Sequence, residues 1–139
     1  MRFHGSCHCG NLEVSFDTAL APESLPVREC SCSFCQRHGA RAATDPAGRL
    51  EVRALDANEV SRYRFALRTA DFLVCRRCGV YVAAACEIDG ATYATLNLNV
   101  LEDRARFSAT AARTDYSRET VEERVARRRR AWTPAVVRC

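Results

Sequence analysis

The sequence predicts a mainly β protein that is stapled by bound metal and has a short helix near its C-terminus. Apolar and polar residues alternate with period two in several short segments, and the β–α–β rhythm of a parallel sheet is absent, so mostly antiparallel strands are expected. Seven of the nine cysteines fall into three tight groups with metal-ligand spacing. The length of 139 residues indicates a single domain spanning residues 1–139.

Composition excludes several classes of protein. All 21 basic residues are arginine, and the absence of lysine rules out a Walker phosphate loop, a Schiff-base lysine and a lysine general base. Apolar residues at 47% and charged residues at 27% are ordinary for a globular domain and argue against disorder, collagen or a coiled coil. No apolar run approaches the roughly 20 residues that span a bilayer, and the first residues lack a secretory signal, so a cytoplasmic location is expected.

The first half of the chain is expected to contain three strands separated by loops. Alternation of apolar positions places these strands, in order, at Leu12, Val14 and Phe16, at Leu50 and Val52, and more weakly at Val60, Tyr63 and Phe65. Residues 19–29 contain two prolines and are expected to form a loop that continues through Cys30, Cys32 and Cys35. Residues 44–48 carry a turn signature.

The second half is expected to contain a hairpin and one helix. Residues 72–74 lead into a CxxC turn that is followed by Gly79, and residues 80–88 and 91–100 read as strands joined by an Asp-Gly turn. Residues 117–130 form the predicted helix, with acidic residues near its start and four arginines at its end. We interpret the arginine run as a solvated helix end rather than a nucleic-acid contact.

The cysteines favour metal binding over disulfides. Their number is odd, no export signal is visible, and neighbours one or two residues apart rarely form a disulfide of good geometry. A closed zinc site takes four ligands and a catalytic site takes three with one open position, so the seven clustered cysteines divide as four plus three. The pairs Cys7/Cys9 and Cys75/Cys78 would form the closed site, and Cys30, Cys32 and Cys35 the open one. Completion of the triad by Cys86 or a histidine, giving two closed sites, is the alternative.

Three segments resemble a known family. They are Gly5-Ser6-Cys7-His8-Cys9-Gly10, Cys30-Ser31-Cys32-Ser33-Phe34-Cys35 and Phe72-Leu73-Val74-Cys75-Arg76-Arg77-Cys78-Gly79, with a weaker likeness at Asn97-Leu98-Asn99. Together they resemble the glutathione-dependent formaldehyde-activating enzyme family, which shares its domain with centromere protein V. The likeness covers a core at about residues 5–103, followed by a helical extension at about 115–131. It implies a β-tent of small antiparallel sheets, a structural zinc on the two pairs, a second zinc on the triad, and glutathione as the thiol.

The predicted chemistry centres on the triad. A zinc held by three thiolates can bind and deprotonate a fourth thiol, which predicts a carbon–sulfur lyase that joins a thiol to an aldehyde, or the reverse step. The family resemblance implies glutathione as the thiol and formaldehyde as the aldehyde. Thiol activation is favoured over zinc-hydroxide hydrolysis because a third thiolate makes the metal a poorer Lewis acid. The alternative is a non-enzymatic zinc-binding module for a protein or nucleic-acid partner. No membrane partner is expected, and the β-rich surface is compatible with a homodimer.

The remaining candidate residues have two interpretations each. His38 is either a proton shuttle or an exposed loop side chain, and Asn97 and Asn99 either line the pocket or occupy outer strand positions. His8 is expected to be exposed, Cys86 to be a buried core thiol and Cys139 to be free and mobile at the terminus. Four arginines flank the cysteine groups and either attract an anionic thiol or offset the thiolate charge: Arg37, Arg41, Arg76 and Arg77.

Overall fold

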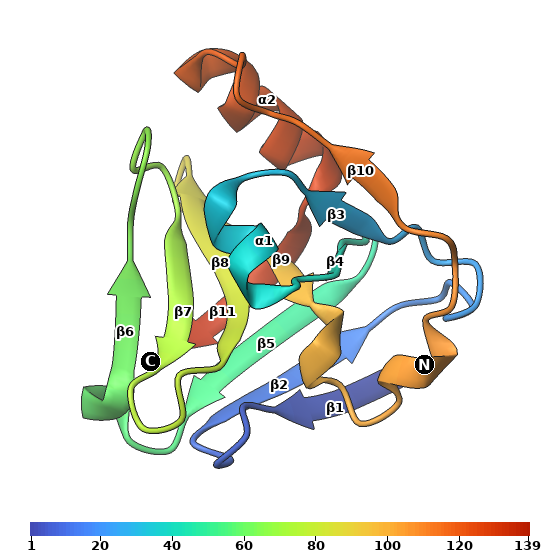
Figure 1. Cartoon of the computed structure of the whole chain (residues 1–139), viewed down its shortest axis with the longest axis vertical. Helices are drawn as coiled ribbons and strands as arrows, with labels where there is room; N and C mark the ends of the chain where they lie inside the picture. The colour runs from blue at the N-terminus through green and yellow to red at the C-terminus, as the bar shows by residue number, and fades with distance from the viewer.

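The computed structural model describes all 139 residues and confirms the mainly β prediction, with eleven strands and two α-helices (Figure 1). The elements are β1 (Arg2–Ser6), β2 (Leu12–Asp17), β3 (Arg28–Cys30), α1 (Ser33–His38), β4 (Ala42–Ala43), β5 (Arg49–Ala54), β6 (Val60–Tyr63), β7 (Asp71–Cys75), β8 (Tyr81–Ile88), β9 (Ala91–Asn97), β10 (Ala112–Thr114), α2 (Val121–Ala131) and β11 (Thr133–Arg138). Short 3₁₀ turns lie between these elements at residues 57–59, 98–100 and 104–106.

Two antiparallel layers make up most of the protein. Strands β1, β2 and β5 form the layer at the base of the view in Figure 1, and β6, β7, β8 and β9 form a meander beside it. Strand β11 joins them, because it pairs in parallel with β5 at one end and antiparallel with β9 at the other. Helix α1 lies in front of β8 and β9 in Figure 1, and α2 lies at the top of the view, above the pair formed by β3 and β10.

Period-two burial explains the strands that the sequence predicts. Alternate residues of β2 are buried, with Leu12, Val14 and Phe16 all inward, and Leu50 and Val52 do the same in β5. Asp89 and Gly90 both have positive φ, 50° and 80°, as a two-residue type I′ turn between β8 and β9 requires. The predicted hairpin is therefore confirmed.

The structure differs from the sequence-based expectations in several strands, in the boundaries of two elements and at the C-terminal residue. The strands β1, β3, β4, β10 and β11 were not predicted, and β10 pairs with β3 in parallel. The second hairpin strand ends at Asn97, where a 3₁₀ turn begins. Helix α2 starts at Val121, because a reciprocal capping box between Thr120 and Glu123 fixes its first turn. Cys139 follows β11 and packs against the core, so it is not a mobile end.

The core has two parts. A main cluster of 21 buried residues fills the space between the two layers and includes the cysteines Cys7 and Cys75. A second cluster of six lies under α1 and α2 and includes Cys35, Tyr81 and Trp132. Each cysteine group is thus attached to a packed part of the protein. No helix is long and apolar enough to cross a membrane.

Close packing around Gly5 gives a prediction for the fold. An added Cβ at Gly5 would clash with the backbone carbonyl oxygen of Val100, at the point where β1 meets Leu101. Gly5→Ala should lower the free energy of unfolding by about 2–3 kcal/mol, the usual size of an overpacking penalty. Urea unfolding of the zinc-loaded protein measures this, with Ser15→Ala on β2 as the control. Equal unfolding midpoints for the two variants would contradict the close contact.

Candidate functional site

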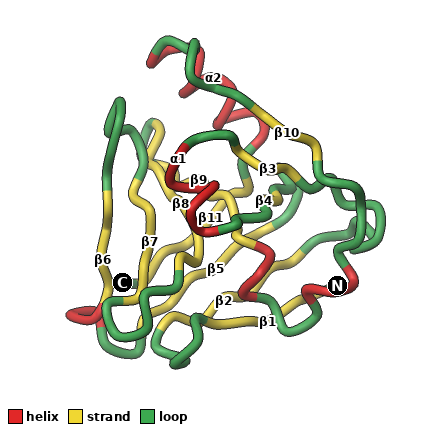
Figure 2. Tube along the Cα trace, in the orientation of Figure 1, coloured by secondary structure: helices red, strands yellow, loops and turns green.

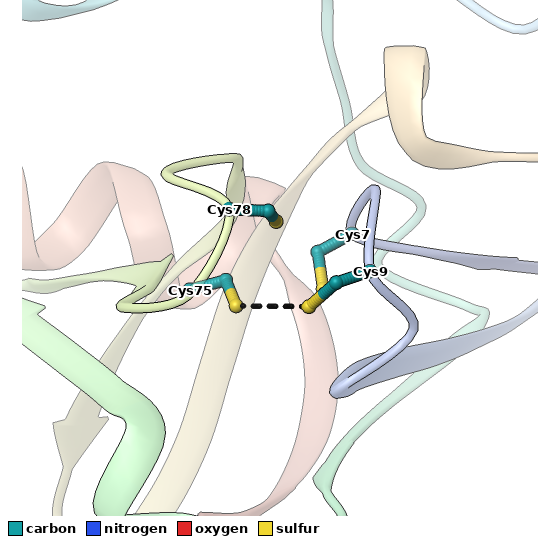
Figure 3. A group of neighbouring side chains, drawn as sticks. All are labelled: Cys7, Cys9, Cys75 and Cys78. Atoms are coloured by element: carbon teal, nitrogen blue, oxygen red, sulfur yellow. Dashed lines mark hydrogen bonds between the residues drawn. The ribbon is translucent and has the colours of Figure 1, made fainter.

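The four cysteines predicted to form the closed site do lie together. Cys7 and Cys9 come from the turn between β1 and β2, whereas Cys75 ends β7 and Cys78 lies in the turn to β8 (Figure 3). Their four sulfur atoms all lie within 4.8 Å of one another. The sulfurs of Cys9 and Cys75 are 3.5 Å apart, so the cluster joins two hairpins separated by 66 residues.

Local backbone geometry turns these sulfurs toward each other. Gly10 and Gly79 have φ of 87° and 78°, which lets each turn curl tightly behind its cysteine pair. The backbone N–H of Leu12 donates to the sulfur of Cys7 at 3.3 Å. Burial raises the pKa of Cys7 to about 12. Burial acts the same way on Cys78, but backbone N–H donors from Cys9 and Val80 outweigh it and hold its pKa at about 6.

This donor set fits zinc. Four sulfurs from two CxC or CxxC turns are the ligands of closed, tetrahedral structural zinc sites. The cluster combines Cys78, whose pKa is lowered, with Cys7, whose pKa is raised by burial, and a bound divalent cation would deprotonate both thiols. His8 is exposed as expected and is not one of the clustered ligands.

The triad also comes together, on a helix start rather than on the predicted loop. Cys30 ends β3, Cys32 is the N-cap residue of α1 and Cys35 lies in its first turn, directly after β3 in Figure 2. The three sulfurs lie within 4.8 Å of one another. The loop expectation was wrong because Cys32 supplies a cap: its sulfur accepts the N–H of Cys35 at 3.4 Å.

Hydrogen bonds within the triad give its three thiols different pKa values. Bonds from Cys30 and then Cys35 lower the pKa of Cys32 to about 2. Hydrogen bonds with Cys30 and then with Cys32 raise the pKa of Cys35, and the hydrogen bond with Cys32 raises the pKa of Cys30. Three sulfur donors with no fourth protein ligand in the cluster fit an open zinc site.

The alternative of a fourth ligand is not supported. Neither Cys86 nor His38 belongs to the sulfur cluster. His38 is exposed at the end of α1, where its ring centroid lies 4.4 Å from that of Phe34 and 5.6 Å from that of Tyr81. Cys86 is only half-buried on β8, at the edge of the second core cluster.

A cavity of about 650 Å³ opens beside the triad. It is lined by the three cysteines, by apolar and aromatic side chains of β7, β8 and the β6–β7 loop, and by arginines of β3 and α2. Tyr81 is buried in this wall, and burial holds the pKa of its phenol well above the usual range. The cavity has the size and mixed lining of a small-molecule site.

The two asparagines hold the structure around the cavity. Asn97 is buried, lines the cavity, and donates to the carbonyl of Tyr81 at 2.9 Å. Asn99 is exposed and donates to the carbonyl of Gly39 at 2.9 Å, which ties the end of α1 to the 3₁₀ turn after β9. Asn97 is therefore a buried pocket residue, while Asn99 anchors α1.

The arginines at the cavity differ from those expected. Arg37, Arg41, Arg76 and Arg77 are not among its lining residues; Arg77, for example, pairs with Asp56 at 3.1 Å. The lining arginines are instead Arg28, Arg124, Arg127 and Arg128. The spacing i, i+3, i+4 of the last three was the available signal, because it places them on one face of a helix.

Comparison with known proteins identifies the family. A family model described as glutathione-dependent formaldehyde-activating enzyme matches residues 2–117, which contain all seven clustered cysteines. A crystal structure of a Rhodobacter sphaeroides protein is similar at 33% sequence identity and a TM-score of 0.61, over 80% of this chain and 99% of that one. The chain therefore belongs to the glutathione-dependent formaldehyde-activating enzyme family.

Proposed function

We propose that the protein is a zinc-dependent carbon–sulfur lyase that condenses a small thiol, such as glutathione, with an aldehyde, such as formaldehyde, or catalyses the reverse step. The observation that carries this proposal is the three-cysteine cluster facing a cavity of about 650 Å³. A closed four-cysteine site has no such opening, because its ligands fill a tetrahedral shell.

The two cysteine clusters would have different roles. Cys7, Cys9, Cys75 and Cys78 would hold a structural zinc, and Cys30, Cys32 and Cys35 a second, catalytic one. Zinc bound by the triad would lower the pKa of a coordinated thiol and keep it nucleophilic at neutral pH. In the forward reaction the thiol sulfur forms a bond to the aldehyde carbon, the carbonyl π electrons move to oxygen, and that oxygen takes a proton. The product is a hydroxymethyl thioether.

The cavity walls would position the reactants and limit water. Phe72 and Tyr81 are packed against Phe34 of α1, with ring centroids 4.8 and 5.0 Å from it, so this wall is rigid and apolar. An apolar wall protects a thiolate from hydration and holds the small carbonyl carbon near it. Asn97 fixes the backbone of Tyr81 in that wall.

Cobalt substitution tests the proposal. Protein loaded with two equivalents of Co²⁺ should show thiolate-to-metal charge-transfer bands, and glutathione should change the bands of one site only. The zinc-loaded protein should form the hydroxymethyl adduct from glutathione and formaldehyde faster than the two reactants form it without protein. NMR exchange spectroscopy measures this rate. Cobalt spectra that are insensitive to every thiol, or binding of a single metal ion, would contradict the proposal.

A further inference from the structure

Helix α2 forms one wall of the cavity and lies beyond residues 2–117, which the family model matches. Three of its arginines, Arg124, Arg127 and Arg128, line the cavity. Arg129 and Arg130 of the same run are exposed on the opposite side. The arginine run is thus divided between two faces, and only one face is a solvated helix end.

The positive charge at this wall exceeds its negative charge. Glu119 accepts two hydrogen bonds from Arg127, at 2.8 and 3.0 Å, and lies 3.5 Å from Arg124. The other acidic residue of the lining, Asp115, is exposed and accepts the backbone N–H of Ser117 at 2.9 Å. Four lining arginines therefore face two carboxylates, of which only Glu119 forms salt bridges with them.

Arg28 and Arg128 have neutral partners only. Arg28 donates to the hydroxyl of Thr44 at 2.7 Å, and Arg128 donates to the carbonyl and hydroxyl oxygens of Thr69 at 3.0 and 2.9 Å. Neither arginine forms a salt bridge with any carboxylate of the chain. Burial lowers the pKa of both guanidinium groups, although arginine stays charged at neutral pH.

Arg128 is the most telling of these groups. It is 6% exposed, its guanidinium lies 4.5 Å from the ring centroid of Trp132, and its Nε is buried with no hydrogen-bond partner. Cys86 lies close enough to interact with it, but burial raises the pKa of that thiol, so Cys86 stays neutral. A buried charge without a counter-ion is costly unless a ligand supplies one.

We propose that Arg28, Arg124 and Arg128 form a carboxylate-binding subsite that selects thiols with an acidic end, with Arg127 held in place by Glu119. This inference rests on the proposed function for the position of the sulfur, which would lie at Cys30, Cys32 and Cys35. The arginine fork matches a carboxylate with two parallel hydrogen bonds. The three cysteines, the aromatic wall and the arginine wall then bind the three parts of one ligand.

Binding measurements separate this subsite from the thiol chemistry. S-methylglutathione keeps both carboxylates of glutathione but has no thiol proton to lose, and its binding to the zinc-loaded protein can be followed by calorimetry. We expect Arg128→Gln to weaken its binding by about 10- to 100-fold, the usual effect of losing a charged hydrogen bond. Arg130→Gln, on the exposed face of the same helix, should bind as the parent does.

A second arm guards against a folding defect in Arg128→Gln. Arg124 is half-buried on the same face of α2, and Arg124→Gln should also weaken the binding of S-methylglutathione. The parent protein should bind 3-mercaptopropionate more tightly than its neutral analogue 3-mercaptopropanol. Equal affinity of parent, Arg124→Gln and folded Arg128→Gln for S-methylglutathione would overturn the inference. If these variants lose S-methylglutathione while cobalt spectra ignore all thiols, the subsite stands and the proposed lyase activity falls.

Discussion

Replacement of Cys32 by serine is expected to remove one zinc ion per chain and the thiol-dependent activity, while the protein stays folded. The fold should survive because serine is a favoured N-cap residue, and its Oγ can accept the N–H of Cys35 as the Cys32 sulfur does. The activity should fall by more than the roughly 10- to 100-fold loss that follows mutation of a residue hydrogen-bonded to a metal ligand, because Cys32 would itself be a ligand. Metal analysis, circular dichroism and the rate of adduct formation measure the three effects.

Cys86→Ser is the matched control for this experiment. Cys86 is a half-buried thiol that belongs to neither sulfur cluster, so its serine variant should keep two zinc ions and the parent activity. A folded Cys32→Ser protein with two zinc ions and full activity would remove the triad from the reaction. Unfolding of Cys32→Ser would mark the second zinc as structural.

The cysteine groups could be predicted from the sequence because their chemistry is local. Two thiols one or two residues apart, with a glycine behind them, form a knuckle whatever the rest of the chain does. The pairing of Cys7/Cys9 with Cys75/Cys78 followed from ligand number alone, and the structure brings all four together. Period-two alternation likewise identified β2 and β5, because alternate residues of each are buried. The hairpin strands β8 and β9 were identified with the help of the Asp-Gly turn between them, and the first five residues of β8 are all buried.

The missed features depend on distant contacts. Strand β11 gains its partners from β5 and β9, and its sequence, with Pro134 inside it, has little strand signal of its own. Strands β3 and β10 have three residues each and depend on distant partners: they pair with each other in parallel, and β3 also pairs with β4. The inward orientation of Arg128 depends on Trp132 and Thr69, and Thr69 is 59 residues away. The sequence alone therefore suggests that all four arginines at 127–130 are exposed to solvent, because it does not show that Thr69 and Trp132 lie beside Arg128.

Replacement of Cys9 by serine is expected to unfold the protein as effectively as replacement of Cys75, although the two side chains are packed very differently. Cys75 is 1% exposed and belongs to the main core, whereas Cys9 is exposed and has little packing to lose. A structural zinc contributes about 10–16 kcal/mol of binding free energy. A domain of this size has about 5–15 kcal/mol of total stability. Loss of the metal therefore outweighs any difference in packing.

The comparison of these two variants with Cys139→Ser tests the structural site directly. Cys139 packs against the same core but is not a ligand, so its variant should melt within a few degrees of the parent and hold two zinc ions. Cys9→Ser and Cys75→Ser should both bind one zinc ion at most and lose the cooperative melting transition. A chelator should bring the parent to the same state. If Cys9→Ser instead melts like Cys139→Ser, packing rather than metal joins the two hairpins, because only a shared zinc makes an exposed thiol as important as a buried one.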